Sequence, residues 1–81
     1  MTFSEALELL KTGRTVQRSG WNGKGMWLKL VTSWSTGEVP VHLPFHPFIM
    51  MKTAIGEYVP WLASQTDILA SDWQETTPIL D

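Results

Sequence analysis

Near the N-terminus, apolar and polar residues follow the period of an α-helix. Five apolar side chains recur at the intervals that place them on one face: Phe3, Ala6, Leu7, Leu9 and Leu10. Thr2 and Glu5 have the spacing of a capping box, and Gly13 is typical of the residue just beyond a helix end. The pattern predicts one helix over about residues 3 to 12, with its apolar face on a sheet.

Later stretches have the composition of β-strands. They cover residues 14–18, 26–32, 48–52 and 58–62. Between the first two, Asn22-Gly23 favours a type I′ hairpin turn, because both central positions of that turn need positive φ. Neighbouring apolar positions in the third and fourth stretches predict burial on both faces, either between helix and sheet or inside an oligomer. Pro60 has no N–H to donate, so the fourth strand should end there or lie at an edge.

Between Pro60 and Trp73 the period becomes helical again for a short distance. Ser64 or Thr66 is expected to cap a short helix near residues 64–70, with Ile68 and Leu69 turned inward. A last strand begins at residues 72–75 and a frayed tail follows at 77–81. Residues 33–47 lack periodicity and are predicted to form a loop, with a possible edge segment at 39–43. The predicted fold class is α+β.

The length and composition of the chain limit these possibilities further. Its 81 residues form a single domain, 1–81, whose core is small enough that oligomerisation is a plausible source of stability. The absence of cysteine excludes disulfides and thiolate metal sites, and fits a reducing cytoplasm. No apolar run approaches the ~20 residues of a membrane span, and the N-terminus does not resemble a signal peptide. We therefore expect no membrane partner.

Charge is distributed unevenly along the chain. Residues 1–30 hold five basic side chains against two acidic ones, whereas residues 31–81 hold one against six. The net charge of −2 argues against binding of long nucleic acid through its backbone. Two interpretations of the asymmetry stay open: a local anion site near the basic turn, or ion pairing between the two halves.

The stretch from Ser19 to Trp27 combines turn-forming glycines with groups that can bind a ligand. Trp21 and Trp27 offer flat apolar faces, while the Lys24 ammonium and free glycine N–H groups can bind an anion. A base-and-phosphate ligand would suit this turn. The alternative is that tryptophans beside a hairpin simply pack across strands or into the core.

Metal and catalytic signals are weak. His42 and His46 have a suggestive spacing, but Pro44 between them opposes a shared helical face, and no carboxylate lies close by in sequence. No Ser or Asp is spaced to identify a triad with either histidine. We therefore predict no metal, no cofactor and no catalytic residue.

Three blocks of sequence resemble a known family. They are Trp21-Asn22-Gly23-Lys24 followed by Met26-Trp27, then Met51-Lys52-Thr53-Ala54, and above all the run from Val59 to Trp73, which reads VPWLASQTDILASDW. These blocks look like the second family of Thoeris anti-defence proteins, which are small phage proteins. The likeness runs from the N-terminal helix to Trp73, and nothing in residues 33–47 contributes to it.

The resemblance implies a molecular sponge that is not an enzyme. Members of this family bind the cyclic ADP-ribose isomer made by the host's TIR-domain sensor, such as glycocyclic ADP-ribose, and do not cleave it. Some relatives also capture cyclic oligonucleotides. The family fold is a small antiparallel β-sheet with an N-terminal helix, assembled into homodimers or homotetramers with ligand pockets between subunits. The implied location is the cytoplasm of the infected bacterial host.

Candidate ligand-binding residues follow from the chemistry of such a ligand. Indole rings can stack on a purine, amides can read a base edge or ribose hydroxyls, a carboxylate can accept from a hydroxyl or amine, and cations with glycine amides can neutralise a pyrophosphate. The candidates are Trp21 and Trp73 for stacking, Asn22, Gln65, Ser64 and Asp67 for polar recognition, and Arg18, Lys24, Gly23 and Gly25 for the phosphates.

Each candidate also has an ordinary structural explanation. Trp27 and Trp61 are expected in the core, Ser64 and Asp67 could cap the short helix, and Arg18 could lie on a solvated face. Two other functions also stay open. One is a hydrolase of the same signal that uses Asp67, Asp72 or a histidine as general base, and the other is a protein-interaction module with exposed tryptophans.

Overall fold

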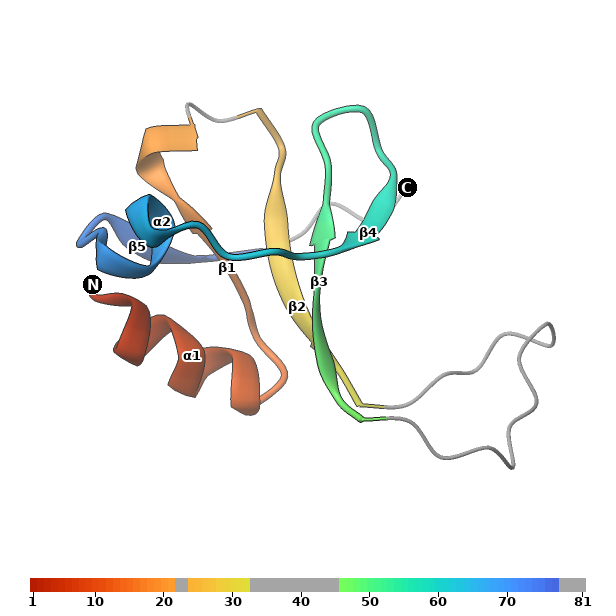
Figure 1. The fold of residues 1–81 in the computed structure, drawn as a ribbon, viewed down its shortest axis with the longest axis horizontal. Coiled ribbons are helices and arrows are strands. Elements are labelled where there is room, and N and C mark those ends of the chain that lie inside the picture. The colour runs from red at the N-terminus through yellow and green to blue at the C-terminus, as the bar shows by residue number, and fades with distance from the viewer. Residues whose placement is uncertain (22–23, 33–45, 78–81) are drawn as a thin grey trace, which may run out of the picture.

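The computed structural model describes residues 1–21, 24–32 and 46–77. Its elements, in chain order, are α1 (Phe3–Lys11), β1 (Thr15–Arg18), the 3₁₀ turn η1 (Ser19–Trp21), β2 (Trp27–Val31), β3 (Phe48–Lys52), β4 (Tyr58–Pro60), α2 (Gln65–Leu69) and β5 (Trp73–Thr76). The predicted α+β class is confirmed (Figure 1).

The strands form one antiparallel sheet in the order β4-β3-β2-β1-β5. β4 and β5 therefore lie at opposite edges, although only residues 61–72 separate them in sequence. This connection crosses in front of the sheet in Figure 1 and contains α2. Trp61 attaches this connection to the sheet and to α1, because its backbone N–H donates to the Ile49 carbonyl at 2.9 Å and its ring centroid lies 5.7 Å from that of Phe3.

Helix α1 begins and ends where the sequence predicted. The Thr2 hydroxyl accepts from the Glu5 N–H, and the Glu5 carboxylate accepts from the Thr2 N–H at 3.0 Å, which completes the capping box. Gly13 follows with φ +90°, a conformation that costs glycine little.

The core lies between α1 and one face of the sheet. Five of its side chains are at most 2% exposed: Ala6, Leu10, Val16, Leu28 and Trp73. Val16 and Leu28 are direct partners across β1 and β2, so they present adjacent apolar side chains to the helix. Trp27 points to the opposite face, because side chains alternate along a strand, yet it is only 7% exposed.

Two predictions about burial within the chain are wrong. All three residues of β4 are exposed, and β4 is an edge strand with one neighbour in the sheet, so helix and sheet do not enclose it. Burial of this strand inside an oligomer stays a prediction. Ile68 and Leu69 are 41% and 80% exposed, not turned inward. In α2 the less exposed position is Asp67, which turns toward Arg18. Pro60 does end an edge strand, as predicted.

The expected turns are partly described. β1 and β2 pair antiparallel, as a hairpin requires, and η1 is a feature that the sequence did not predict. Asn22 and Gly23 lie outside the described residues, as do 33–45, with the suggested edge segment, and 78–81 of the predicted tail. Neither described helix has the length and continuous apolar character that crossing a bilayer requires.

Candidate ligand-binding site

The two sequence stretches that carry candidate ligand groups meet at one end of the sheet. β1 and β5 pair with Arg18 opposite Trp73, which brings the end of β1 and η1 beside α2 and the start of β5. Residues nearly fifty positions apart therefore come into direct contact. Their convergence is a result of the tertiary structure.

Arg18 is the centre of this junction. Its Nε donates to Asp72 Oδ1 at 2.7 Å and its Nη1 to Asp67 Oδ1 at 2.7 Å, with a longer contact of 3.4 Å from Nη2 to Asp72 Oδ2. The side chains of Arg18 and Asp67 are each 17% exposed, so the pairing is shielded from solvent. Arg18 is thus not on a solvated face.

The Asp72 carboxylate also holds the turn that follows β1. Its Oδ2 accepts from the Gly20 N–H at 2.8 Å and from the Ser19 hydroxyl at 3.3 Å. Hydrogen bonds from Arg18 and then from the Gly20 N–H, acting against the effect of burial, lower the pKa of Asp72 to about 2. A carboxylate that is this weak a base is a poor general base at neutral pH, which argues against Asp72 in the hydrolase alternative.

An aromatic cluster lies next to these charges. Trp73 contacts Phe3, Trp21 and Trp61 at ring centroid distances of 5.2, 5.4 and 6.0 Å, and its indole N–H donates to the Asp67 carbonyl at 2.9 Å. With 2% of its surface exposed, Trp73 has no face open to a base. The stacking role predicted for Trp73 is therefore wrong for this chain, because Trp73 is a core residue. The sequence could not show this, since an indole ring with its N–H suits both a core position and a ligand site.

Trp21 is placed differently. It is half-buried, and it meets Trp73 edge-on at an interplanar angle of 78°. An edge-on contact uses the edge of one ring and the face of the other, so it fixes the orientation of Trp21. Trp27 is buried and Trp61 packs against the core, as predicted.

The polar candidates on α2 lie at its first turn. The Ser64 hydroxyl accepts from the Asp67 N–H at 3.1 Å, which makes Ser64 the N-cap. Gln65 is exposed, and Asp67 Oδ2 has no hydrogen bond within the described part of the chain. Gln65 is therefore more open to an outside partner than Asp67, whose Oδ2 is an acceptor that no other described residue uses.

The basic candidates of the turn are only partly described. Lys24 is exposed and makes no ion pair with another described residue. Gly25 has φ +75°, and its carbonyl accepts from Lys52 Nζ at 3.0 Å. Arg14 pairs with Glu75 at 2.9 Å. Ion pairing between the halves of the chain is thus the correct interpretation for Arg14 and Arg18, and Lys24 remains a cation for the anion site.

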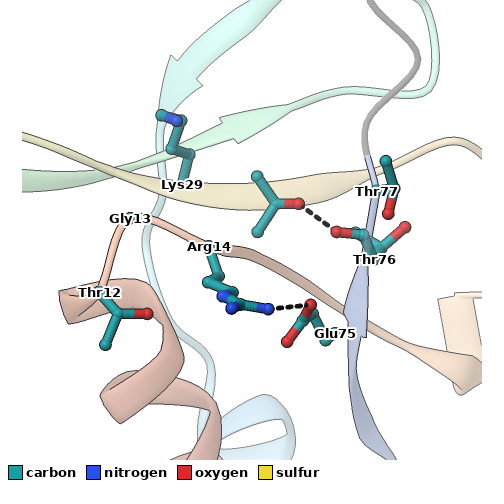
Figure 2. Close-up of a pocket in the computed structure, with 8 residues that line it drawn as sticks. Thr12, Gly13, Arg14, Lys29, Glu75, Thr76 and Thr77 are labelled. Atoms are coloured by element: carbon teal, nitrogen blue, oxygen red, sulfur yellow. Dashed lines mark hydrogen bonds and ion pairs between the residues drawn. The ribbon is translucent and has the colours of Figure 1, made fainter.

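A hollow of about 270 Å³ lies at the far end of β1 and β5 (Figure 2). Its wall contains the Arg14 and Glu75 pair, Lys29 of β2 and the hydroxyls of Thr12 and Thr76. None of the predicted ligand-binding residues lines it. The hollow and the Arg18 junction are separate features of the molecule.

Metal binding finds no support in the described residues. They contain no group of three or more His, Asp or Glu side chains arranged to hold an ion. His46 is exposed, and His42 lies outside the described residues.

Sequence reasoning missed the use of Asp72 and Gly20 in holding the turn. From the sequence, Asp72 is a candidate only as a general base. A signal was present, because an acidic residue just before β5 and a basic residue at the end of β1 become neighbours once the two strands pair. The identity of the pairing strands could not be derived from local pattern.

The fold and the junction define a small antiparallel α+β protein with a tryptophan-bearing turn clamped against a short polar helix. A family model described as "Tad2-like: Thoeris anti-defense 2-like domain" matches residues 1–76. A protein named "Thoeris anti-defense 2" from Bacillus phage SP01 is 46% identical over 81 residues, covering 90% of this chain and 91% of the relative. The chain belongs to the Thoeris anti-defense 2-like family, and its function is phage anti-defence.

Proposed function

We propose that this protein binds and sequesters a cyclic nucleotide second messenger without cleaving it, in the cytoplasm of the infected host. The preferred ligand class is a cyclic ADP-ribose isomer such as glycocyclic ADP-ribose, with cyclic oligonucleotides as a second class. The observation that carries the proposal is the junction itself: in a member of an anti-defence family, Arg18 brings the Trp21 turn against the polar turn of α2.

Each part of the ligand has a chemical partner at this junction. Trp21 offers an indole for base stacking, which contributes ~1–3 kcal/mol per base. Gln65 and Asp67 Oδ2 are suited to base edges or ribose hydroxyls, together with Ser64 and Asn22. Lys24, with the amides of Gly23 and Gly25, is suited to the pyrophosphate.

The proposed site includes a second subunit. Sequestration at nanomolar concentration requires ~12 kcal/mol of binding free energy. One half-buried indole and a few exposed polar groups supply only part of this. We therefore propose a homodimer or homotetramer with ligand pockets between subunits, since a pocket closed from two sides removes more ligand surface from water. Leu62 and Leu69, which are 92% and 80% exposed, are apolar surface that such an assembly could bury.

Ligand recovery tests sequestration directly. Glycocyclic ADP-ribose is mixed with excess protein, the protein is removed by filtration, and the retained fraction is heat-denatured and analysed by mass spectrometry. The proposal predicts that the ligand leaves the filtrate and returns chemically intact. A linearised or dephosphorylated product would establish the hydrolase instead.

The exposed leucines also favour a second candidate, a protein-interaction module for a host polypeptide. A thermal-shift panel of cyclic ADP-ribose isomers, cyclic dinucleotides and cyclic trinucleotides separates the two. Sequestration predicts stabilisation by at least one ligand, and its loss in Trp21→Ala. No shift with any nucleotide, together with stoichiometric co-purification of a host protein, would select the interaction module.

A further inference from the structure

We infer that Arg18 is a positioning residue of the ligand site, which holds Trp21 and α2 in their relative orientation and does not contact the ligand's phosphates. This inference rests on the proposed function for its binding consequences. Its structural part, that one guanidinium fixes the orientation of Trp21, stands on the geometry of the junction alone.

The guanidinium is already occupied by the protein. Nε, Nη1 and Nη2 all face carboxylates, two of the contacts are 2.7 Å long, and only 17% of the side chain is exposed. Binding to Asp72 raises the pKa of Arg18, with Asp67 contributing next, so the group keeps its charge. A phosphate would have to compete with two carboxylates that the fold holds in place, one of them through a paired Nε and Nη2 contact.

The same carboxylates connect Arg18 to both halves of the site. Asp72 accepts the Gly20 N–H immediately before Trp21, and its own carbonyl accepts the Ser19 N–H at 3.1 Å. Asp67 belongs to α2, and its carbonyl accepts the indole N–H of Trp73, on which Trp21 rests. Arg18 therefore joins the backbone of the turn to the helix, and the turn presents the ring of Trp21 to Trp73.

Space at the junction is also limited. A Cβ at Gly20 would lie 2.8 Å from Asp72 Oδ2 and 3.2 Å from Arg18 Nη2. The turn can approach the carboxylate this closely only because residue 20 has no side chain. The short contact between the Gly20 backbone and the Arg18–Asp72 ion pair fixes the position of the turn that carries Trp21.

The charge count points the same way. One guanidinium between two carboxylates leaves a formal charge of −1, so the cluster does not attract an anion. Lys24, which is exposed and makes no ion pair with the other described residues, is the cation available to the phosphates. Removal of Lys24 and removal of Arg18 should therefore have different signatures.

Salt dependence and near-ultraviolet circular dichroism distinguish the two roles. Affinity for glycocyclic ADP-ribose is measured at 50 and 500 mM NaCl for wild type, Arg18→Gln, Arg18→Lys and Lys24→Gln. Arg18→Gln should weaken binding about tenfold or more at both salt concentrations, so the ratio of the affinity at 50 mM to the affinity at 500 mM NaCl should equal that of wild type. Lys24→Gln should reduce this ratio of affinities, because it removes a charge–charge attraction that salt screens.

The spectroscopic arm reports on Trp21 whether or not a ligand is present. Arg18→Gln should lower the near-ultraviolet signal toward that of Trp21→Phe, and Lys24→Gln should leave it unchanged. Arg18→Lys should not restore the signal, because an ammonium cannot present the planar fork that faces both carboxylates. An unchanged signal in Arg18→Gln, or a loss of salt dependence in that variant, would overturn the inference.

Asp72→Asn provides a second route if Arg18→Gln does not fold. It keeps the volume of the side chain and should lower the same signal, and the two changes combined should be less than additive because they break one network. An unchanged signal in Asp72→Asn would also overturn the inference. Absence of ligand binding by the wild type would refute the proposed function, whereas the spectroscopic result would still decide the role of Arg18.

Discussion

At the scale of single residues, Trp73 shows how one side chain type serves two purposes. It is the largest of the fully buried side chains among the described residues, and it contacts three other aromatic rings while its N–H finds a backbone carbonyl. A buried tryptophan needs this acceptor, and Asp67 supplies it from α2. Trp73 thus stabilises the core and supports the site with the same ring.

Truncation of Trp73 should therefore act on stability first. Trp73→Ala is expected to lower the free energy of unfolding by about 3–5 kcal/mol, because it removes a fully buried aromatic side chain. Urea titration followed by circular dichroism measures the change. Trp21→Ala is the matched comparison: being half-buried, it should cost less stability but more ligand affinity. Equal stability of Trp73→Ala and wild type would contradict the assignment to the core.

Asp72 gives a prediction in pH. Its pKa in the folded protein is about 2, below the ordinary value of 3.8, so its ionised form stabilises the fold at every pH above about 4. That contribution should be lost as the pH falls from about 4 to about 2. The free energy of unfolding, measured by urea titration across this range, should fall more steeply in wild type than in Asp72→Asn. Parallel curves of the free energy of unfolding against pH for the two proteins would refute the stabilising role of ionised Asp72.

At the scale of elements, the helix caps are side chains among those that the sequence proposed: the Thr2 and Glu5 box for α1, and Ser64, one of two candidates, for α2. Thr2 with Glu5 begins α1, and Ser64 begins α2. The Glu5 carboxylate accepts hydrogen bonds from the Thr2 N–H and from the Thr2 hydroxyl. Both lower the pKa of Glu5, the N–H more than the hydroxyl. These local contacts define where each helix starts, independently of the sheet.

Loss of the α1 cap has a predictable cost. Thr2→Ala should lower the free energy of unfolding by about 1 kcal/mol, because the Glu5 N–H loses its acceptor. Thr2→Ser should retain most of the stability, since it keeps the hydroxyl. Ser4→Ala is the control, because Ser4 is exposed and is not the cap. A thermal melt that ranks Ser4→Ala below Thr2→Ala would show that the box does not stabilise the helix.

At the scale of the whole molecule, the crossing segment leaves apolar side chains on the outside. Leu62 precedes α2 and Leu69 is its last residue, and both side chains are mostly exposed. These leucines are apolar surface that the proposed assembly would bury. The proposed assembly should therefore depend on them.

Leu62→Asp combined with Leu69→Asp is expected to shift the protein toward monomer in analytical ultracentrifugation. The fold should survive, because these side chains contribute little to the core. Ile55→Asp is the control: Ile55 is 81% exposed but lies on the β3–β4 turn, so its replacement should leave the association unchanged. A double variant that associates as wild type does would place the interface elsewhere.

The sequence by itself determined the local structure. The capping box, Gly13, the strand compositions and Pro60 act through contacts within a few residues, so their spacing predicted α1, the strands and the end of β4. For the N-cap of α2 the sequence left Ser64 and Thr66 open, and the structure has Ser64. The chemistry of Trp21, Gln65 and Asp67 could likewise be recognised as suited to a ligand, because side-chain type decides it.

Only the tertiary structure decided which faces were buried and which charges met. Trp73 is buried because β5 pairs with β1 at the edge of the sheet opposite β4. In α2, which lies on the connection to β5, Asp67 faces Arg18 while Ile68 and Leu69 are exposed. The same pairing of strands places Arg18 between the carboxylates of Asp72 and Asp67, so its guanidinium is not available to a phosphate. Such contacts join residues about fifty positions apart, and the local period of a sequence carries no information about them.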